Sequence, residues 1–409
     1  MSLRPHLPVL LSVAAAAAAG PSGRPARWPT PSETPTYQAV SVGASHTCAV
    51  TTSGEAFCWG SNLYGELGSA AAAERCSLYH GSRTVYPCSS TPLSASGGLT
   101  FQSVSAGADY TCGLATDGAA YCWGRNDIGQ LGGGSTTERC RVEDSSVPCS
   151  AVPVAVAGGL TFRSVDAGCG VTTGDFTYCW GGAGGADTLP GAGPVPVSRR
   201  LIFRVVSVGD THACGLTPRG EAYCWGRNEY GQLGTGSFDT LPQPSPLRVA
   251  GAHLFASLSV GANYTCGLTT GGVGFCWGIN LLGRQRCTYE IPRTACATTP
   301  MRLPGALAFR SVSAGDAYAC GVTAGDVALC WGENDSGQLG LGSDSTDRST
   351  TPERVRAALS FRSVSAGRYH TCALTVDGVA YCWGRNSNGQ LGSGSMTRSA
   401  TPVRVSDPR

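Results

Sequence analysis

The cysteines of this sequence are the side chains whose number and spacing indicate a chemical role. The chain of 409 residues contains 20 cysteines, and seven pairs of them lie ten positions apart around a glycine-containing turn. Such a pair could hold a metal ion, exchange electrons or form a structural disulfide. The seven pairs are Cys48–Cys58, Cys112–Cys122, Cys169–Cys179, Cys214–Cys224, Cys266–Cys276, Cys320–Cys330 and Cys372–Cys382. The other cysteines also come in close pairs, which are Cys76–Cys88, Cys140–Cys149 and Cys287–Cys296.

Two of these three chemistries do not suit the spacing. Zinc sites bring four ligands together, typically as two close pairs, whereas each cysteine pair here lies in its own segment with at most one histidine nearby. Redox-active dithiols normally have the spacing C-x-x-C. An even number of cysteines with none left over is typical of a disulfide framework in an oxidising compartment. We therefore expect ten structural disulfides, and neither a metal nor a cofactor.

The segments that must position the cysteines are copies of one unit. Its pattern is FxSVSAG-xxx-TCGLTxxG-xAYCWGxNxxGQLG, and copies begin near residues 37, 101, 162, 203, 255, 309 and 361. Within each copy, short runs alternate apolar and polar residues between glycine-containing turns, so we expect four β-strands, the last led by proline. Four short strands per repeat are typical of a propeller blade. The sequence predicts an all-β fold, a seven-bladed β-propeller of four-stranded blades, over residues 37–409.

The turn in the first copy, CAVTTSGEAFC, predicts how the cysteines meet. If residues 52–54 form a three-residue hairpin loop, Thr51 pairs with Glu55, and Cys48 lies directly opposite Cys58. Cα atoms of such a non-hydrogen-bonded pair lie about 4.5 Å apart, which a disulfide can bridge. The same count applies to the other six hairpins. Each blade therefore carries one cross-strand disulfide.

The same register places an aromatic or leucine residue opposite a small one in every hairpin. Phe57 pairs with Ala49, for example, and we expect its ring to lie over the small residue. Trp59 and its six equivalents then belong to the core between blades rather than to a ligand cage.

Histidine and tyrosine alternate at the position two residues before the first cysteine of each hairpin. His46, His212 and His370 stand where other copies have Tyr110, Tyr264 and Tyr318. This interchange predicts a shared hydrogen bond rather than proton transfer.

The first 36 residues differ from the repeats. Residues 1–19 contain an arginine, an apolar run and a small-residue end, as a secretory signal does, and residues 20–36 form a Pro/Ser-rich linker. The apolar run is shorter than the ~20 residues that span a bilayer, so we expect no membrane span. The formal charge of +2 offers no basic surface for nucleic acid. We predict a secreted, periplasmic or cell-surface protein and expect a monomer.

The chain ends suggest how the ring closes. The first copy has no dependable proline-led strand ahead of it, whereas the seventh ends with a complete one at 401–405. We therefore predict that the N- and C-terminal strands pair with one another.

No G-x-S-x-G, H-E-x-x-H, P-loop or EF-hand spacing occurs, so we do not expect an enzyme.

The repeat pattern resembles that of the regulator of chromosome condensation family, whose members are seven-bladed β-propellers. The resemblance covers residues 37 to about 405; WGxN occurs in six of the seven copies and G[QE]LG in five. The family pattern does not usually carry the paired cysteines, so the chain resembles a secreted, cysteine-rich form. Propellers similar to it include exchange factors for a small GTPase, parts of ubiquitin ligases and a secreted bacterial inhibitor of β-lactamases.

Fold alone does not choose among these functions. The leading interpretation is a secreted propeller that binds another macromolecule, which we expect to be a protein, through one loop face. Two alternatives stay open: a guanine-nucleotide exchange factor or chromatin-associated regulator of the same family, and a carbohydrate-binding propeller.

The three loops that hold the additional cysteine pairs, at 69–91, 133–152 and 284–299, predict where the partner binds. Together with the A-G-x-x-x turns they lie on the face opposite the T-x-x-G turns, and long irregular loops are where a scaffold usually places recognition. Tyrosine and arginine are enriched at interfaces. The candidate partner-binding residues are Tyr79, Tyr86, Arg139, Arg141, Arg286, Tyr289 and Arg293.

Overall fold

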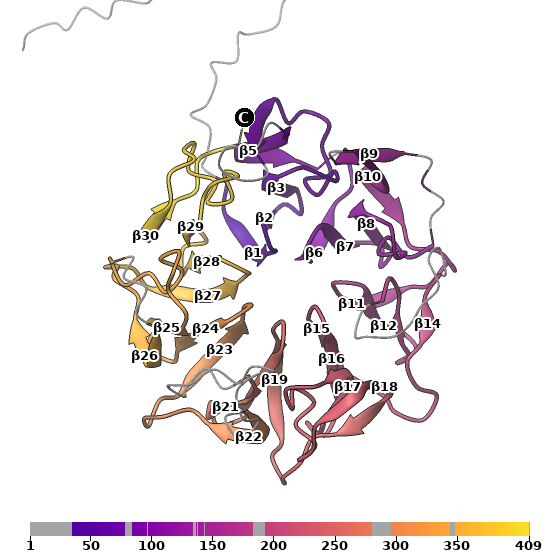
Figure 1. Cartoon of the computed structure of the whole chain (residues 1–409), viewed down its shortest axis with the longest axis vertical. Coiled ribbons are helices and arrows are strands. Elements are labelled where there is room, and N and C mark those ends of the chain that lie inside the picture. The colour runs from indigo at the N-terminus through magenta and orange to yellow at the C-terminus, as the bar shows by residue number, and fades with distance from the viewer. Residues whose placement is uncertain are drawn as a thin grey trace, which may run out of the picture. The chain divides into compact units, whose positions relative to one another are not determined.

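The computed structural model describes residues 35–77, 84–95, 97–133, 136, 138–142, 144–182, 193–279, 296–343 and 348–408. Each repeat in this part of the chain folds into one antiparallel sheet, and the seven sheets are arranged around a centre as the blades of a propeller (Figure 1). The predicted all-β fold with seven blades is confirmed. The proposed signal segment 1–19 and most of the linker 20–36 lie outside the described residues.

In the last five blades the strands follow one another in chain order from the centre of the ring outward, whereas in the first two blades the fourth strand of the chain lies outside the fifth. The first blade contains β1 (Tyr37–Val42), β2 (His46–Thr51), β3 (Ala56–Ser61), β4 (Glu74–Ser77) and β5 (Val85–Ser94). The second contains β6 (Phe101–Ala106), β7 (Tyr110–Ala115), β8 (Ala120–Arg125), β9 (Arg139–Val142) and β10 (Ser145–Ala155). The third contains β11 (Phe162–Asp166), β12 (Cys169–Thr172), β13 (Thr177–Cys179) and β14 (Val195–Pro196). The fourth contains β15 (Val205–Val208), β16 (His212–Leu216), β17 (Ala222–Asn228) and β18 (Asp239–Arg248). The fifth contains β19 (Phe255–Val260), β20 (Tyr264–Thr269), β21 (Gly274–Gly278) and β22 (Ala297–Arg302). The sixth contains β23 (Phe309–Ala314), β24 (Tyr318–Thr323), β25 (Ala328–Gly332) and β26 (Ser349–Arg354). The seventh contains β27 (Phe361–Ala366), β28 (His370–Thr375), β29 (Ala380–Gly384) and β30 (Ser399–Arg404).

The hairpin between the second and third strands of each blade has the predicted register. Cys48 pairs directly with Cys58 across β2 and β3, and their Cα atoms lie 4.1 Å apart in a disulfide. Disulfides at the equivalent positions are Cys112–Cys122, Cys169–Cys179, Cys214–Cys224, Cys266–Cys276, Cys320–Cys330 and Cys372–Cys382. These cysteines are buried in the ring, so each disulfide joins two strands inside the core.

Two of the cysteine-bearing insertions are strands rather than loops. β4 pairs with β5 and β9 pairs with β10, so each insertion adds a fifth strand to its sheet. Cys76 lies opposite Tyr86 in β5, and its disulfide therefore runs diagonally to Cys88 with Cα atoms 5.9 Å apart. Cys140–Cys149 is arranged in the same way, at 5.8 Å. For the third insertion, Cys287 lies outside the described residues and Cys296 within them.

The core of the protein lies between neighbouring blades. The tryptophan after the second cysteine is at most 1% exposed in every blade, as Trp59 and Trp123 illustrate. Trp123 packs with Phe101 of its own blade against Val50 and Leu67 of the first blade. The predicted core role of these tryptophans is confirmed.

The small residue beside the first cysteine of each hairpin is required by a different aromatic side chain from the predicted one. Gly113 does pair with Tyr121, but a Cβ added at Gly113 would meet the ring of Phe101 at 2.6 Å. Phe162 and Phe203 occupy the same space at Gly170 and Gly215. The phenylalanine of the first strand, not the cross-strand aromatic, therefore requires a small residue there.

The ring closes by contact between complete blades. β1 pairs with β2 and β30 pairs with β29, so the terminal strands belong to neighbouring sheets and do not form the predicted pair. The reason is that the first repeat begins at the innermost strand and supplies its own outer strand, β5. The N–H of Tyr37 instead donates to the carbonyl of Gly378 at 2.9 Å, and Trp59 packs against Leu391 and Val405 of the last blade.

Candidate binding face

A closed series of hydrogen bonds joins the innermost strands around the centre of the propeller. In six blades a serine hydroxyl of the innermost strand accepts from a backbone N–H of the next blade, as Ser41 does from Ala106 at 2.9 Å. In the degenerate third repeat Asp166 replaces this serine, and its carboxylate accepts from the N–H of Val208 at 3.0 Å. The last junction uses Ser365, which accepts from Val42 at 3.1 Å. The seven acceptors are Ser41, Ser105, Asp166, Ser207, Ser259, Ser313 and Ser365. This series fixes the backbone turns that follow each strand.

The interchangeable histidines and tyrosines form a second set of bonds between blades. His46 Nε2 lies 2.9 Å from Thr111 Oγ1 of the second blade, and His370 Nε2 lies 2.8 Å from Thr47 Oγ1 of the first. The hydroxyl of Tyr318 donates to the carbonyl of His370 at 2.5 Å. Both residue types hydrogen-bond to the next blade, as predicted, but the bond is not the same one, because histidine bonds to a threonine hydroxyl and tyrosine to a backbone carbonyl. Burial lowers the pKa of His46 to about 4 and that of His370 to about 3, so both are neutral at pH 7.

The turns between the first and second strands of each blade surround a cavity of about 450 Å³ at the centre of one face. We call this the cavity face. Gly43, Gly107, Gly209, Gly261, Gly315 and Gly367 of these turns line it. Neighbouring turns are also bonded to one another: the N–H of Asp316 donates to the carbonyl of Gly367 at 3.1 Å. The wall of the cavity is therefore rigid backbone, and the side chains that project from it determine its chemistry.

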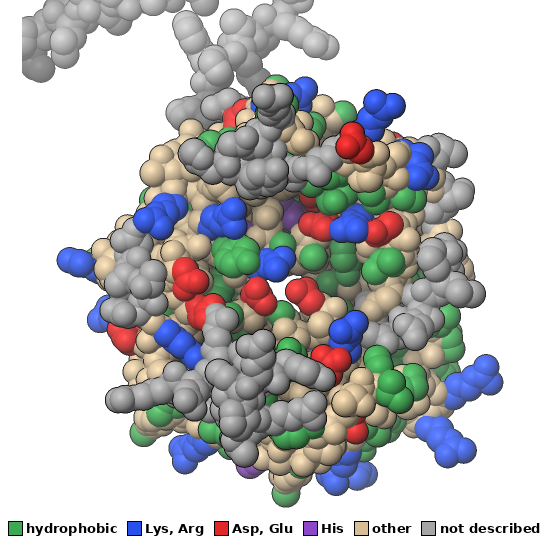
Figure 2. All heavy atoms as spheres, in the orientation of Figure 1, with side chains coloured by type: hydrophobic (Ala, Val, Ile, Leu, Met, Phe, Trp, Pro, Cys, Tyr) green, Lys and Arg blue, Asp and Glu red, His purple; other side chains and the backbone are tan. Residues whose placement is uncertain are grey.

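Charged side chains from different blades converge on this cavity. Asp109, Asp210 and Asp316 line it together with Arg125 and Arg368, and Figure 2 shows acidic side chains gathered around the centre with basic ones between them. Arg368 lies 3.4 Å from Asp316, and Arg125 lies 3.1 Å from Asp109. Burial and the negative charge of Asp316 raise the pKa of Asp210 above its ordinary value, while Arg368 lowers it. Asp127 and Asp166 also line the cavity, so carboxylates outnumber guanidinium groups there.

Aromatic side chains lie beside these arginines. The guanidinium of Arg125 lies 5.1 Å from the ring centroid of Tyr64. Arg368 and Arg385 lie 5.4 and 5.3 Å from the ring of Tyr369. Arginine and tyrosine placed in this way are common in protein interfaces.

The carboxylate of Glu66 lies buried beneath this face. Glu66 is 2% exposed and stands where four other repeats have glutamine. Its Oε2 accepts from the N–H of Tyr64 at 2.8 Å, and its Oε1 accepts from the hydroxyl of Ser61 at 3.2 Å. Burial, with a smaller contribution from Asp109, raises the pKa of Glu66 to about 8.

The predicted partner-binding residues have different environments. Tyr86 is 6% exposed, and its hydroxyl donates to Asn388 of the last blade at 2.8 Å, so its side chain serves the contact between blades. Arg139 and Arg141 are exposed on β9. The others lie outside the described residues; they are Tyr79, Arg286, Tyr289 and Arg293.

The residues of the cavity were not predicted from the sequence. Their signal was present, because the two positions after the turn glycine vary among repeats whose strands are nearly constant: Ala108-Asp109, Asp210-Thr211, Asp316-Ala317 and Arg368-Tyr369. In a repeat protein, variation on a constant scaffold indicates a surface that is not required for folding.

No group of three histidine, cysteine or acidic side chains able to hold a metal occurs within the described part of the chain. The described residues also contain no helix long and apolar enough to cross a membrane.

The repeats match a known family. The description of the matching family models is regulator of chromosome condensation (RCC1) repeat, and the matched residues are 37–66, 101–130, 203–232, 309–338 and 361–390 for one model and 117–173, 219–268, 327–374 and 377–409 for another. The chain belongs to the RCC1 repeat family. The matches cover more than half of its length.

The chain is similar to segments of longer proteins. The chain is 32% identical to the ultraviolet-B receptor UVR8 of Arabidopsis thaliana over 205 residues, which are 49% of this chain and 46% of the receptor. It is 28% identical to the human E3 ubiquitin-protein ligase HERC2 over 376 residues, which are 87% of this chain and 7% of the ligase. The chain thus spans less than half of either relative.

The fold is also that of a solved RCC1 structure. Yeast RCC1 (Prp20), in its complex with Kap60, has a TM-score of 0.50 and 20% identity, and the match covers 90% of this chain and 74% of Prp20. At this identity the likeness shows the fold alone.

Proposed function

We propose that this RCC1-repeat propeller is a disulfide-stabilised protein-binding scaffold, exported to an oxidising compartment, and that its partner docks on the cavity face. The observation that carries the proposal is the convergence of Asp109, Asp210, Asp316, Arg125 and Arg368 around one cavity, at positions that the repeat does not require. A constant scaffold with variable charged residues at one place is the usual arrangement of a recognition surface.

The chemistry of the cavity indicates the kind of partner. Asp210 has no ion pair among the described residues, and its pKa is raised by burial and by the neighbouring carboxylates. A cationic side chain of a partner would relieve this repulsion. Tyr369 and Ile128, which is 47% exposed, provide apolar area beside the charges. The partner is therefore a protein that presents a basic side chain to the centre of the face.

Relatives support binding over catalysis. Prp20 was solved bound to Kap60, so a protein that contains this fold has a protein partner. The exchange-factor alternative would require reduced cysteines in a nuclear or cytosolic compartment, whereas nine disulfides are present in the described residues.

Affinity capture with charge-neutral variants tests the proposal. The chain without residues 1–36 is immobilised and exposed to the extracellular fraction of its source, and the captured protein is quantified for wild type, Asp210→Asn/Asp316→Asn and the control Asp377→Asn on the opposite face. We expect the double variant to reduce capture at least tenfold and the control to leave it unchanged. Undiminished capture by the double variant would contradict the proposed face.

A second measurement tests the compartment. Alkylation of the protein recovered from its source, without reduction, should label no cysteine. Recovery from the cytosol or nucleus with free thiols would contradict export.

A further inference from the structure

The outer edge of each blade is protected by proline, with two exceptions. Directly after β30, Val405 donates its N–H inward to Ala380 of the same blade, so by the alternation of a strand Pro402 of β30 faces outward. Proline has no N–H, and at this place it removes a donor that could recruit a foreign strand. The same count places the following prolines at outward positions of the fourth strands: Pro92, Pro153, Pro196, Pro246, Pro300 and Pro352.

The exceptions are the added strands β4 and β9, which form the outermost edges of the first and second blades; β9 is labelled at the outer rim in Figure 1. Neither contains proline. Arg139 lies opposite Pro148, and the carbonyl of Pro148 accepts from Asn126 on the other side of β10. The Arg139–Pro148 pair therefore has no hydrogen bonds between its strands, and the backbone N–H and C=O of Arg139 point to the free edge.

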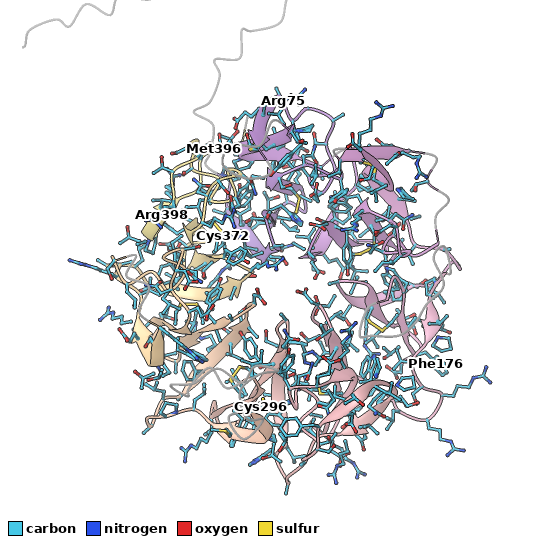
Figure 3. All side chains as sticks on the ribbon, viewed as in Figure 1. Arg75, Phe176, Cys296, Cys372, Met396 and Arg398 are labelled. Atoms are coloured by element: carbon cyan, nitrogen blue, oxygen red, sulfur yellow. A yellow bond between two sulfur atoms is a disulfide. The ribbon has the colours of Figure 1, made fainter. Side chains whose placement is uncertain are left out.

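Strand alternation places the backbone groups of Arg141 at the same free edge. In β4, Arg75 lies opposite Pro87, whose carbonyl likewise accepts from Asn62, so Arg75 has the same orientation. Arg75 lies at the outer rim of the first blade (Figure 3). Within the described residues, no backbone hydrogen bond is made by Arg75, Arg139 or Arg141 outside their own hairpins.

The two edge strands share the same sequence motif and the same supporting contacts. Each reads Glu-Arg-Cys before the hairpin and Pro-Cys-Ser after it, at 74–76 and 87–89 and at 138–140 and 148–150. Glu74 accepts from the N–H of Ser90 at 2.8 Å, and Glu138 accepts from the N–H of Ala151 at 3.0 Å. A disulfide closes each hairpin. The edges are thus held in an extended conformation before anything binds, which lowers the entropic cost of strand addition.

Arginine decides which strand can pair with these edges. The side chains of Arg139 and Arg141 are exposed on one side of β9 and would oppose alternate residues of an added strand. Arg139 donates from its Nε to Ser146 Oγ at 3.0 Å and from one terminal nitrogen to the Ser146 carbonyl at 2.7 Å, which leaves its other terminal nitrogen for such a strand. A second copy of this chain would bring arginine against arginine, which is destabilising. A strand with acidic residues at alternate positions would be complementary in charge.

We propose, on the basis of the protein-binding function above, that the partner adds an extended acidic segment as a further β-strand to the edge of β9 or β4. The backbone groups of Arg139, Arg141 and Arg75 supply the hydrogen bonds, and their guanidinium groups select acidic side chains. The cavity face and the free edges then contact different parts of one partner.

The test uses a fluorescein-labelled peptide in which glutamate alternates with valine or threonine. Control peptides replace glutamate with lysine, or place proline at alternate positions so that strand pairing is blocked. Binding to the disulfide-intact propeller is followed by fluorescence anisotropy at low salt. We expect binding of the acidic peptide alone, with slowed amide hydrogen exchange at Arg139 and Arg141.

Two protein variants separate the backbone from the charge. Arg75→Pro/Arg141→Pro gives the edges the proline that protects the other blades, and it should weaken peptide binding at least tenfold with an unchanged urea midpoint. Arg75→Gln/Arg141→Gln keeps the N–H groups and should weaken binding while removing most of its salt dependence. Absence of acidic-peptide binding, binding unaffected by the proline variant, or binding without slowed amide exchange would each overturn the inference.

The same variants distinguish this inference from the proposed function. If partner capture is lost with Asp210→Asn/Asp316→Asn but retained by Arg75→Pro/Arg141→Pro, the edge inference is wrong and the protein-binding function stands. Capture unaffected by the aspartate variant but lost with the proline variant would support the edges and contradict the cavity face.

Discussion

Replacing Glu66 by glutamine should stabilise the protein at alkaline pH and leave it unchanged at acidic pH. Glu66 occupies a position at which other repeats have a buried glutamine, such as Gln390, whose Oε1 accepts from the N–H of Asn388 at 2.8 Å. Glu66 accepts from Tyr64 in the same way. Glutamine therefore fits the site without loss of that bond. Its amide NH2 donates to the Ser61 hydroxyl in place of the bond that Glu66 accepts from it, so the main change is the removal of the buried charge.

The magnitude follows from the pKa of Glu66, which burial raises from 4.5 to about 8. The folded protein holds this proton more tightly than the unfolded chain. The contribution to stability is therefore complete below about pH 4.5, decreases as pH rises toward 8, and is lost above it. Since one pKa unit corresponds to about 1.4 kcal/mol, the ionised carboxylate lowers the free energy of unfolding by up to about 5 kcal/mol at pH 9.

The assay is urea unfolding of the disulfide-intact protein, followed by tryptophan fluorescence between pH 4.5 and 9. We expect the difference in free energy of unfolding between Glu66→Gln and wild type to increase across this range. Gln390→Glu is the matched control, because it places a carboxylate at the equivalent position of the seventh blade and should produce the opposite pH dependence. A Glu66→Gln difference that does not change between pH 4.5 and 9 would refute the reasoning.

Three further predictions concern contacts between blades. Burial lowers the pKa of His46 to about 4, so its stabilising contribution is complete above pH 6.5 and is lost as pH falls toward 4. The variant His46→Tyr, which copies Tyr110, should therefore reduce unfolding by acid in this range. An unchanged acid transition would contradict this prediction. Burial raises the pKa of Asp166, so replacing this carboxylate by serine in Asp166→Ser should increase the urea midpoint at pH 7. Asp166→Ala loses the bond to Val208 and should decrease the midpoint. Equal effects of the two variants would disprove the role of that bond. Deletion of residues 399–409 removes β30 and exposes the core of the last blade, so the melting temperature should fall markedly; an unchanged melting temperature would show that the strand is dispensable.

The sequence by itself determined the blades and the disulfide within each hairpin. The number of repeats, the order of four strands in each and the pairing of Cys48 with Cys58 depend on contacts between residues close in the chain. Alternating hydrophobicity, turn glycines and loop length encode such contacts directly. For the same reason the repeat position shared by histidine and tyrosine could be assigned to hydrogen bonding before its partner was known.

The tertiary structure alone decided how the blades meet and what lies between them. That β30 belongs to the last blade, that Phe101 fills the space at Gly113, and that Tyr86 is buried against Asn388 all depend on packing between different strands or blades. The gathering of Asp109, Asp210 and Arg368 depends on ring closure, which brings together turns that are far apart in the chain. No local pattern records these distances, because side-chain contacts between blades are fixed only when the whole ring is formed.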